Sequence, residues 1–385
     1  MRVTFIDPPL WDYDCDTPLR EPLGGTQSGV CYLSAELAAR GVSVSVVNGV
    51  ASPREVRGVR FVGADHLRAD FLNEADVVVV ASHADAARYR NQFGVRKPLV
   101  LWAHHAPDQN PITGLRDRAS HAAWNRIVLL SEWQRQAFTN AFDIDQDRIG
   151  ILRNAVGPSF LEAPPRPWFE TGAAPTFVYS STPYRGLAPL LLMFPTIRKA
   201  LPRAELRVFS SLAVYRKKED EDPHRYLYEV ARSMPGVHYE GSVAQPALAK
   251  AMQNAAALTY PSVFAETSCI GVMEALATGA EVISTAFGAI PETSATITAA
   301  GRNRCQFSRK KRHAATAHST TGTFPEDAPD DASAMKPRLT FPPDGMPARM
   351  RGLPSSAEAA RQARATRSRR NLELEGEIVI GRNPA

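Results

Sequence analysis

Short segments that are almost wholly apolar alternate with helical patterns, and this alternation most constrains the fold. The first series of such segments occupies residues 3–6, 44–47, 77–80, 99–103 and 127–130. Strands that are apolar at nearly every position are buried on both faces, which is typical of a parallel sheet covered by helices. The helix predicted after the first segment begins near Thr26, carries Val30, Leu33 and Leu37 toward the core, and ends at residues 40–41. This pattern predicts a doubly wound α/β fold.

A second series follows a Pro-rich stretch at residues 161–170. It predicts strands at 177–180, 206–210, 237–240, 257–260 and 282–284, with helices over 187–200 and 246–256. Two Rossmann-like halves joined by a linker place a cleft between the carboxyl ends of both sheets. The predicted boundaries are a first domain at 1–160, a linker at 161–175, a second domain at 176–295 and a tail at 296–385.

The tail differs from the rest of the chain in composition. Residues 296–385 contain 16 Lys and Arg against 9 Asp and Glu, whereas residues 1–295 contain 29 against 31. The high isoelectric point therefore comes from the tail, whose lack of apolar periodicity predicts disorder. A basic arm that contacts an anionic membrane is one hypothesis for it, and a segment without specific function is the alternative. No RNA-binding motif or interleaved aromatic residues favour a specific nucleic-acid partner.

Several classes of protein are disfavoured by simple features. No apolar run is long enough to span a bilayer, and the N-terminus enters a predicted strand without a signal peptide. Four cysteines lack paired ligand spacing, which favours free thiols and no zinc site. We therefore expect a cytoplasmic protein, with the inner face of the membrane as the alternative location.

The stretch at residues 261–279 carries the densest set of candidate site residues. After a predicted strand that ends at Pro261, Thr267 or Ser268 is expected to cap a helix that stops at Gly279. Glu266 lies in the loop and Glu274 lies in the helix. The free amides of a helix N-terminus attract phosphate, whereas carboxylates accept hydrogen bonds from hydroxyls. Together they favour a sugar nucleotide as ligand.

Other candidate groups follow predicted strands. Gly24 and Gly25 lie in the loop before the first helix, where glycine permits close approach of a ligand. His104 and His105 follow the predicted strand at 99–103, where α/β sheets bind ligands. Arg185 follows Ser180-Ser-Thr-Pro-Tyr, and its guanidinium can bind two phosphate oxygens.

Read in order, these motifs resemble the retaining GT-B glycosyltransferases of the family 4 type. The resemblance covers roughly residues 1–293. It rests on the Gly24-Gly25 loop and on the segments 102–104, 131–133, 153–156, 184–187, 241–243, 266–274 and 287–292. It implies a GT-B fold with two Rossmann-like domains facing a cleft, a truncated second domain and a disordered basic tail.

The resemblance also implies roles for individual residues. Glu274 would bind the ribose hydroxyls, Glu266 would lie near the transferred sugar, and Arg185 would reach the diphosphate. The cleft histidine that contacts the sugar would be His104. The remaining donor-binding positions would be Gly24, Gly25, Ser180, Val243, Cys269 and Ile270. No metal or other cofactor is implied, because cations and helix N-termini stabilise the leaving diphosphate.

The implied reaction is sugar transfer, with retention, from a nucleotide-diphosphate donor to a glycan or lipid-linked acceptor in polysaccharide, lipopolysaccharide or glycoconjugate synthesis. The sequence departs from the family pattern at Ser180, where Arg is usual, at Cys269, where Gly is usual, and after Glu292, where further helices are usual. The abrupt change there resembles translation in a wrong reading frame. The alternatives are a non-catalytic remnant that binds nucleotide or a partner, and a GT-B epimerase or phosphorylase.

Overall fold

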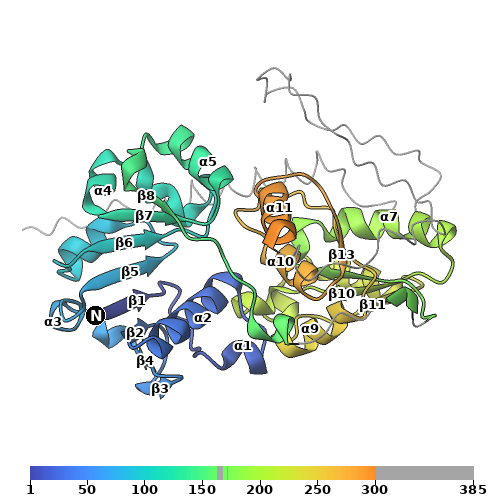
Figure 1. Ribbon diagram of the computed structural model, residues 1–385, viewed down its shortest axis with the longest axis horizontal. Helices are drawn as coiled ribbons and strands as arrows, with labels where there is room; N and C mark the ends of the chain where they lie inside the picture. Colours follow the sequence, from blue (N-terminus) through green and yellow to red (C-terminus); the bar gives the residue numbers. More distant parts are fainter. Residues whose placement is uncertain (163–167, 171, 301–385) are drawn as a thin grey trace, which may run out of the picture. The chain divides into compact units, whose positions relative to one another are not determined.

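Two separate sheets organise the chain, as the two series of apolar segments predict. A computed structural model describes residues 1–162, 168–170 and 172–300. Within this described part, one sheet has eight strands in the order β3-β4-β2-β1-β5-β6-β7-β8, and the other has five in the order β11-β10-β9-β12-β13. Most neighbouring strands are parallel, and β3 pairs antiparallel to β4. Figure 1 shows both sheets with their flanking helices.

The first domain contains a larger number of elements than the apolar runs predict. Its strands are β1 (Arg2–Ile6), β2 (Ser43–Val47), β3 (Arg54–Val56), β4 (Val59–Val62), β5 (Val77–Ala81), β6 (Leu99–Trp102), β7 (Arg126–Leu129) and β8 (Ile149–Ile151). Its helices are α1 (Thr17–Arg20), α2 (Gly25–Ala39), α3 (Ala69–Leu72), α4 (Arg118–Ala123), α5 (Glu132–Phe142) and α6 (Pro158–Leu161). Strands β3, β4 and β8 were not predicted.

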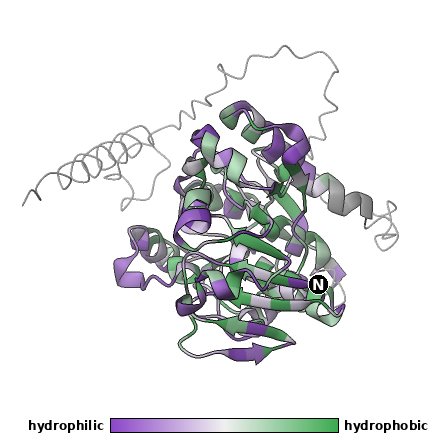
Figure 2. Ribbon diagram, turned by 90° about the vertical axis from the view of Figure 1, so that its left-hand side faces the viewer, coloured by the Kyte–Doolittle hydropathy of each residue, from purple (hydrophilic) through white to green (hydrophobic). Residues whose placement is uncertain are grey.

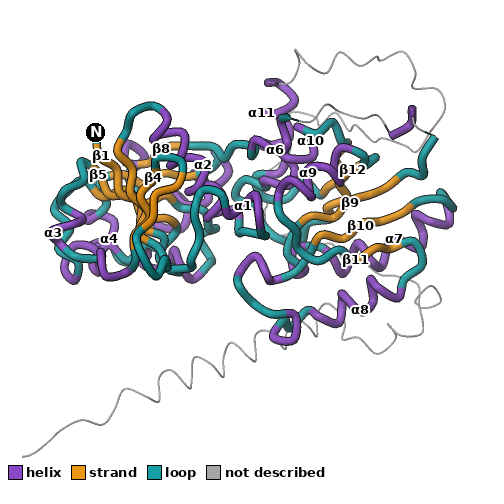
Figure 3. The backbone as a smooth tube through the Cα atoms, turned by 90° about the horizontal axis from the view of Figure 1, so that it is seen from below, coloured by secondary structure: helices purple, strands orange, loops and turns teal. Residues whose placement is uncertain are grey.

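The second domain follows the predicted series closely. Its strands are β9 (Thr176–Ser180), β10 (Glu205–Phe209), β11 (Val237–Tyr239), β12 (Ala257–Tyr260) and β13 (Glu281–Ser284). Its helices are α7 (Leu187–Ala200), α8 (Arg225–Ser233), α9 (Gln245–Gln253), α10 (Ile270–Ala277) and α11 (Ile290–Ala300). Figure 3 shows β9, β10 and β11 side by side, and α7 and α9 lie on opposite sides of this sheet (Figure 1). Right-handed crossovers require this arrangement, because the strand order reverses at β9.

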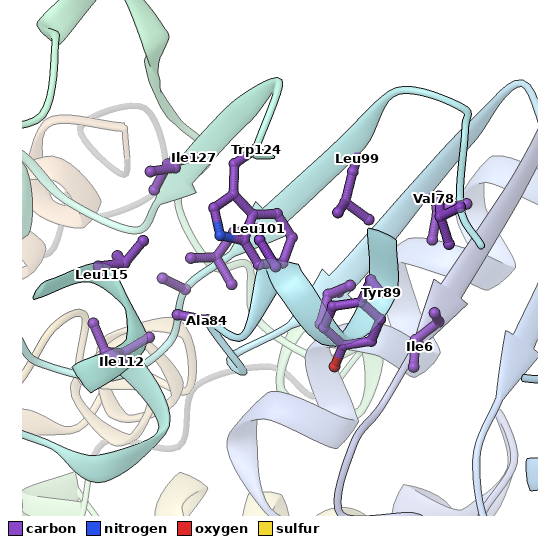
Figure 4. Close-up of a cluster of buried hydrophobic side chains, with 14 of the residues drawn as sticks. Ile6, Val78, Ala84, Tyr89, Leu99, Leu101, Ile112, Leu115, Trp124 and Ile127 are labelled. Carbon is purple, nitrogen blue, oxygen red and sulfur yellow. The ribbon is translucent and has the colours of Figure 1, made fainter. Parts of the chain in front are cut away.

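Apolar side chains from neighbouring strands build the core of the first domain. Ile6, Val78, Leu99, Leu101 and Ile127 are each at most 1 % exposed. They pack with Tyr89, Trp124, Ile112 and Leu115 (Figure 4). The apolar character of the strands is visible in Figure 2. Burial on both faces explains why these strands read as continuous apolar runs.

The first strand of the second domain begins at the predicted start of that domain, whereas its last helix extends past the predicted end. Strand β9 begins at Thr176, next to the predicted start of the domain. Helix α11 continues through Ala300, beyond the predicted boundary at residue 295. Residues 163–167 and 171 of the predicted linker, and the tail from residue 301 onward, lie outside the described residues.

Candidate functional site

One cavity of about 680 Å³ is lined by residues of both domains. The carboxyl ends of β1, β5 and β6 contribute to it from the first domain, and those of β9 and β12 contribute from the second. Every predicted site residue lines this cavity, namely Gly24, Gly25, His104, Ser180, Arg185, Val243, Glu266, Cys269, Ile270 and Glu274. The structure thus brings them together, and their roles remain predictions.

Glu266 lies in the loop between β12 and α10, and two groups hold its carboxylate. Arg185 Nη1 donates to both carboxylate oxygens at 2.9 and 3.0 Å, and the Tyr260 hydroxyl donates to Oε1. Gly288, at φ 65°, lies directly against this loop, where a Cβ atom would come within 2.4 Å of the Glu266 carbonyl oxygen. The loop conformation therefore depends on glycine at position 288.

Arg185 ends a short turn after β9 and is almost enclosed by aromatic side chains. Its guanidinium lies 4.4 Å from the Phe264 ring centroid and 5.7 Å from that of Tyr184. Burial acts to lower the pKa of Arg185, but Glu266 and the neighbouring tyrosines outweigh it, so that the pKa rises well above its ordinary value. Arg185 is a fixed positive charge in the cavity.

Helix α10 begins at Ile270, and the predicted cap at Thr267 or Ser268 is wrong. The N-cap residue is Cys269, in the left-handed conformation at φ 62° and ψ 73°, with no side-chain cap. The Cys269 carbonyl already accepts from the amides of Val272 and Met273. The first amides of the helix have no partner within it and face the cavity end of the helix, which suits an anion.

Thr267 instead makes a contact to the first domain. Its hydroxyl donates to the carbonyl oxygen of His104 at 2.9 Å. The amide of His104 donates to Ser82 Oγ at 2.9 Å, and its ring lies 4.4 Å from that of Trp102. Burial lowers the pKa of His104 to about 3, so the imidazole is neutral. Its buried Nε2 has no hydrogen-bond partner among the described residues.

Glu274 lies one turn into α10 and is 6 % exposed. Burial raises the pKa of its carboxyl to about 8, and no cation pairs with it among the residues described. A buried carboxyl without a counter-charge gains most from ligands that donate hydrogen bonds, such as a pair of hydroxyls.

The glycine loop places the start of α2 against the start of α10. Gly24 is the N-cap of α2, and Gly25 is its first residue. A Cβ atom on Gly25 would lie 3.1 Å from Ile270 Cδ1, and one on Gly24 would lie 2.8 Å from Gln27 Oε1. Two helix N-termini therefore approach each other at the cavity, and small residues allow it.

Three motifs that are far apart in sequence meet at Glu292. Its two carboxylate oxygens accept from the amides of Glu132 and Trp133, each at 3.0 Å, and Arg153 also donates to it. Burial raises the pKa of Glu292, but these donors outweigh that effect and lower it. Helix α11 is thus joined to the N-terminus of α5, where a carboxylate is favoured by the helix dipole.

Asp7 and Tyr260 also line the cavity and were not predicted from the sequence, whereas His105 was a candidate beside His104. Asp7 directly follows β1, and its position after an apolar run was the available signal. Tyr260 is the last residue of β12, where an aromatic residue is typical of strands in general.

Comparisons with known proteins agree with this geometry. Residues 174–317 match the family model described as glycosyl transferases group 1. This segment, which is less than half of the chain, is therefore similar to that family. A comparison with curated protein sequences gives no match.

Solved structures extend the likeness to the first domain. Sucrose-phosphate synthase from Thermosynechococcus elongatus aligns with a TM-score of 0.55 at 14 % identity, covering 75 % of this chain and 82 % of that one. Anabaena HepE in complex with UDP and glucose gives 0.54 at 14 %, with 76 % and 82 % covered. A trehalose-phosphate synthase from Burkholderia vietnamiensis gives 0.52 at 11 %, with 76 % and 84 % covered. The chain therefore has the GT-B fold.

Two further observations concern metals and membranes. Within the described residues, no group of three or more His, Cys, Asp or Glu side chains is placed to hold a metal ion. Among the same residues, no helix combines the length and the apolar character needed to cross a bilayer.

Proposed function

We propose that the protein transfers a glycosyl group, with retention, from a nucleoside-diphosphate sugar to an acceptor hydroxyl. The observation that carries this proposal is the single cavity in which Arg185, Glu266, Glu274 and the N-terminus of α10 converge. The match to group 1 glycosyltransferases supports it, as do GT-B relatives such as the Anabaena protein solved with UDP-glucose. Retention rests on the family resemblance.

In this proposal the second domain binds the donor. The buried carboxyl group of Glu274 accepts hydrogen bonds from the ribose hydroxyls, and the first amides of α10 bind diphosphate oxygens. Arg185 contributes the positive charge, which requires that a diphosphate share the guanidinium with Glu266. Cys269 and Ile270 supply backbone groups rather than side chains, which is compatible with an apolar residue at each position.

Transfer breaks the bond between the sugar C1 and the diphosphate oxygen and forms one between C1 and the acceptor oxygen. The diphosphate oxygen leaves with the electron pair and takes the proton that the acceptor hydroxyl releases. Arg185 and the helix amides stabilise the charge that develops on the leaving group. Glu266, held by Arg185 and Tyr260, lies at the boundary between the phosphate and sugar positions. Because these groups supply the stabilisation, we propose that no metal ion is required.

The direct test is release of nucleoside diphosphate from a panel of UDP- and GDP-sugars, with product anomers read by NMR. We expect turnover with at least one donor, insensitivity to EDTA, and a product with the donor's anomeric configuration. Arg185→Ala should reduce turnover by about 100-fold. Glu274→Ala should weaken UDP or GDP binding by about 10- to 100-fold.

A non-catalytic nucleotide-binding remnant is the second candidate, and Ser180 favours it. Ser180 lines the cavity where an additional arginine would supply phosphate charge. A folded protein that binds nucleotide in a thermal-shift assay but releases none from any donor would support this second candidate instead.

A further inference from the structure

The first sheet has a topological feature that the proposed function does not use. Its strand order reverses at β1, which lies between β2 and β5. In open α/β sheets a ligand crevice forms at the carboxyl ends of the strands where the order reverses. Asp7 follows β1 directly, and His83 follows β5 on the other side of the reversal. Both residues line the cavity.

Asp7 is a fully buried carboxylate that no cation neutralises among the residues described. Gln27 Nε2, from the first turns of α2, donates to both of its oxygens at 3.2 Å. Burial raises the pKa of Asp7 to about 6, against the lowering effects of Gln27 and Tyr13, so the group is ionised above neutral pH. A carboxylate can accept about four hydrogen bonds, and the Gln27 amide with the neighbouring Tyr13 hydroxyl leaves part of this capacity unused.

Unpartnered polar atoms surround the same end of the cavity. Within the described part of the chain, Ser28 Oγ, His83 Nδ1 and His105 Nδ1 are buried without hydrogen-bond partners. Burial lowers the pKa of His83 and lowers that of His105 to about 4, and nearby Arg185 adds to the second shift. Each neutral imidazole offers one donor and one acceptor. Such unpaired groups are costly when buried, and a ligand rich in hydroxyls would satisfy them.

The charges on this side of the cavity point to an uncharged ligand. Arg88 is the single arginine or lysine among the described first-domain residues that line the cavity, and its side chain is exposed. Asp7, in contrast, is fully buried. An anionic group at the buried end would be repelled by Asp7. A sugar or cyclitol ring presents the mixed hydroxyl donors and acceptors that these residues can pair.

We propose that Asp7 is a specificity-determining residue that accepts hydrogen bonds from the hydroxyls of an uncharged polyhydroxylated acceptor bound at the β1–β5 crevice. Gln27 acts as the positioning residue for this carboxylate. The proposal rests on the proposed glycosyl transfer, and it names the acceptor class that the first domain selects. Asp7 orients a hydroxyl here and takes no proton.

The test measures binding by saturation-transfer NMR, with and without UDP or GDP. The probes are glucose, myo-inositol and glycerol, with glucose 6-phosphate as the anionic counterpart of glucose. We expect wild-type protein to bind at least one neutral polyol more tightly than glucose 6-phosphate. Asp7→Asn should weaken that binding by about 10-fold or more, because the variant presents a donor where an acceptor was.

Controls separate this proposal from the proposed function. Asp12→Asn removes a carboxylate of the same post-β1 segment that pairs with Arg54 outside the cavity, and it should leave polyol binding unchanged. Nucleotide affinity should be equal in wild type and Asp7→Asn. If neither wild type nor the variants bind nucleotide, the proposed donor site is contradicted. The polyol measurement tests the β1–β5 crevice independently of that result.

Three outcomes would overturn the proposal: wild type binds none of the polyols, it prefers glucose 6-phosphate, or Asp7→Asn binds polyols as wild type does. If circular dichroism shows that Asp7→Asn does not fold, polyol binding by Gln27→Met tests the proposal instead. That variant keeps the carboxylate and removes its orienting amide, so polyol binding should fall by several-fold. Unchanged binding in a folded Gln27→Met protein would then contradict the proposal.

Discussion

At the scale of single residues, the cavity concentrates ionisable groups in unusual states. Glu274 is buried without a counter-ion among the described residues, Asp7 is buried beside Gln27 and Tyr13, and the pKa of His104 is lowered to about 3. Perturbed pKa values of this kind cluster at functional sites, because burial that serves ligands also desolvates the side chains. The free-energy cost of burying these ionisable groups is measurable as a dependence of the free energy of unfolding on pH.

Glu274→Gln tests this dependence. The folded-state pKa of about 8 lies above the unfolded value of 4.5. The contribution of Glu274 to stability is therefore fully present below pH 4.5 and is lost as the pH rises toward and through 8. Urea unfolding between pH 5 and 9 should show wild type losing up to a few kcal/mol relative to Glu274→Gln. Parallel pH profiles for the two proteins would contradict the assignment.

Tyr260→Phe tests how Glu266 is held. Removing the hydroxyl deletes one donor to the carboxylate and leaves Arg185 in place. We expect kcat to fall by about 10-fold with little change in donor KM, because one hydrogen bond to a charged group is worth about 1.5 kcal/mol or more. Tyr179→Phe is the matched control, since its hydroxyl donates to the Thr182 carbonyl at 2.9 Å and not to Glu266. Equal kinetics in both variants would remove Tyr260 from the site.

At the scale of elements, the start of α10 depends on an uncommon backbone conformation. Cys269 has φ 62°, which β-branched side chains adopt only with strain. Cys269→Gly should fold with a stability within about 1 kcal/mol of wild type, because relief of strain is offset by lost packing. Cys269→Val should be less stable than Cys269→Gly by about 1–2 kcal/mol. Urea denaturation of both variants measures this, and equal stabilities would argue against the left-handed cap.

Elements were predictable from sequence where burial on both faces dictated composition. Strands such as β5 and β12 were found because every position faces a helix or the core. Strands β3 and β8 were missed because three-residue strands with exposed or half-buried positions carry no periodic signal. The cap at Cys269 was missed because capping propensity favours Thr and Ser, whereas tertiary contacts set this loop. Asp7 was missed because a single Asp after a strand has the same appearance as a turn residue.

At the scale of the whole molecule, side-chain contacts connect the domains around the cavity. Thr267 bonds to His104, and the Glu292 carboxylate binds the first amides of α5. Thr267 follows Glu266 directly, and the amide of Ala289, near Glu292, donates to the Glu266 carbonyl at 2.7 Å. The loop at Glu266 therefore packs against both contacts, which involve the motifs at 131–133 and 153–156.

Glu292→Gln tests this connection. Loss of the charge at the N-terminus of α5 should speed hydrogen exchange at the amides of Glu132 and Trp133 by about 10-fold, since a charge-assisted bond is roughly twice as strong as a neutral one. Glu281→Gln, at an exposed position of β13, should leave their exchange unchanged. Equal exchange in wild type and Glu292→Gln would contradict the contact.

Conversion of a nucleotide sugar in the cavity is tested by release of nucleoside diphosphate. Release of UDP or GDP is measured for the full-length protein and for Glu266→Gln across the donor panel. We expect release by wild type from at least one donor and a loss of about 100-fold or more in Glu266→Gln. A folded wild-type protein that releases nucleoside diphosphate from no donor, or a Glu266→Gln variant as active as wild type, would contradict it.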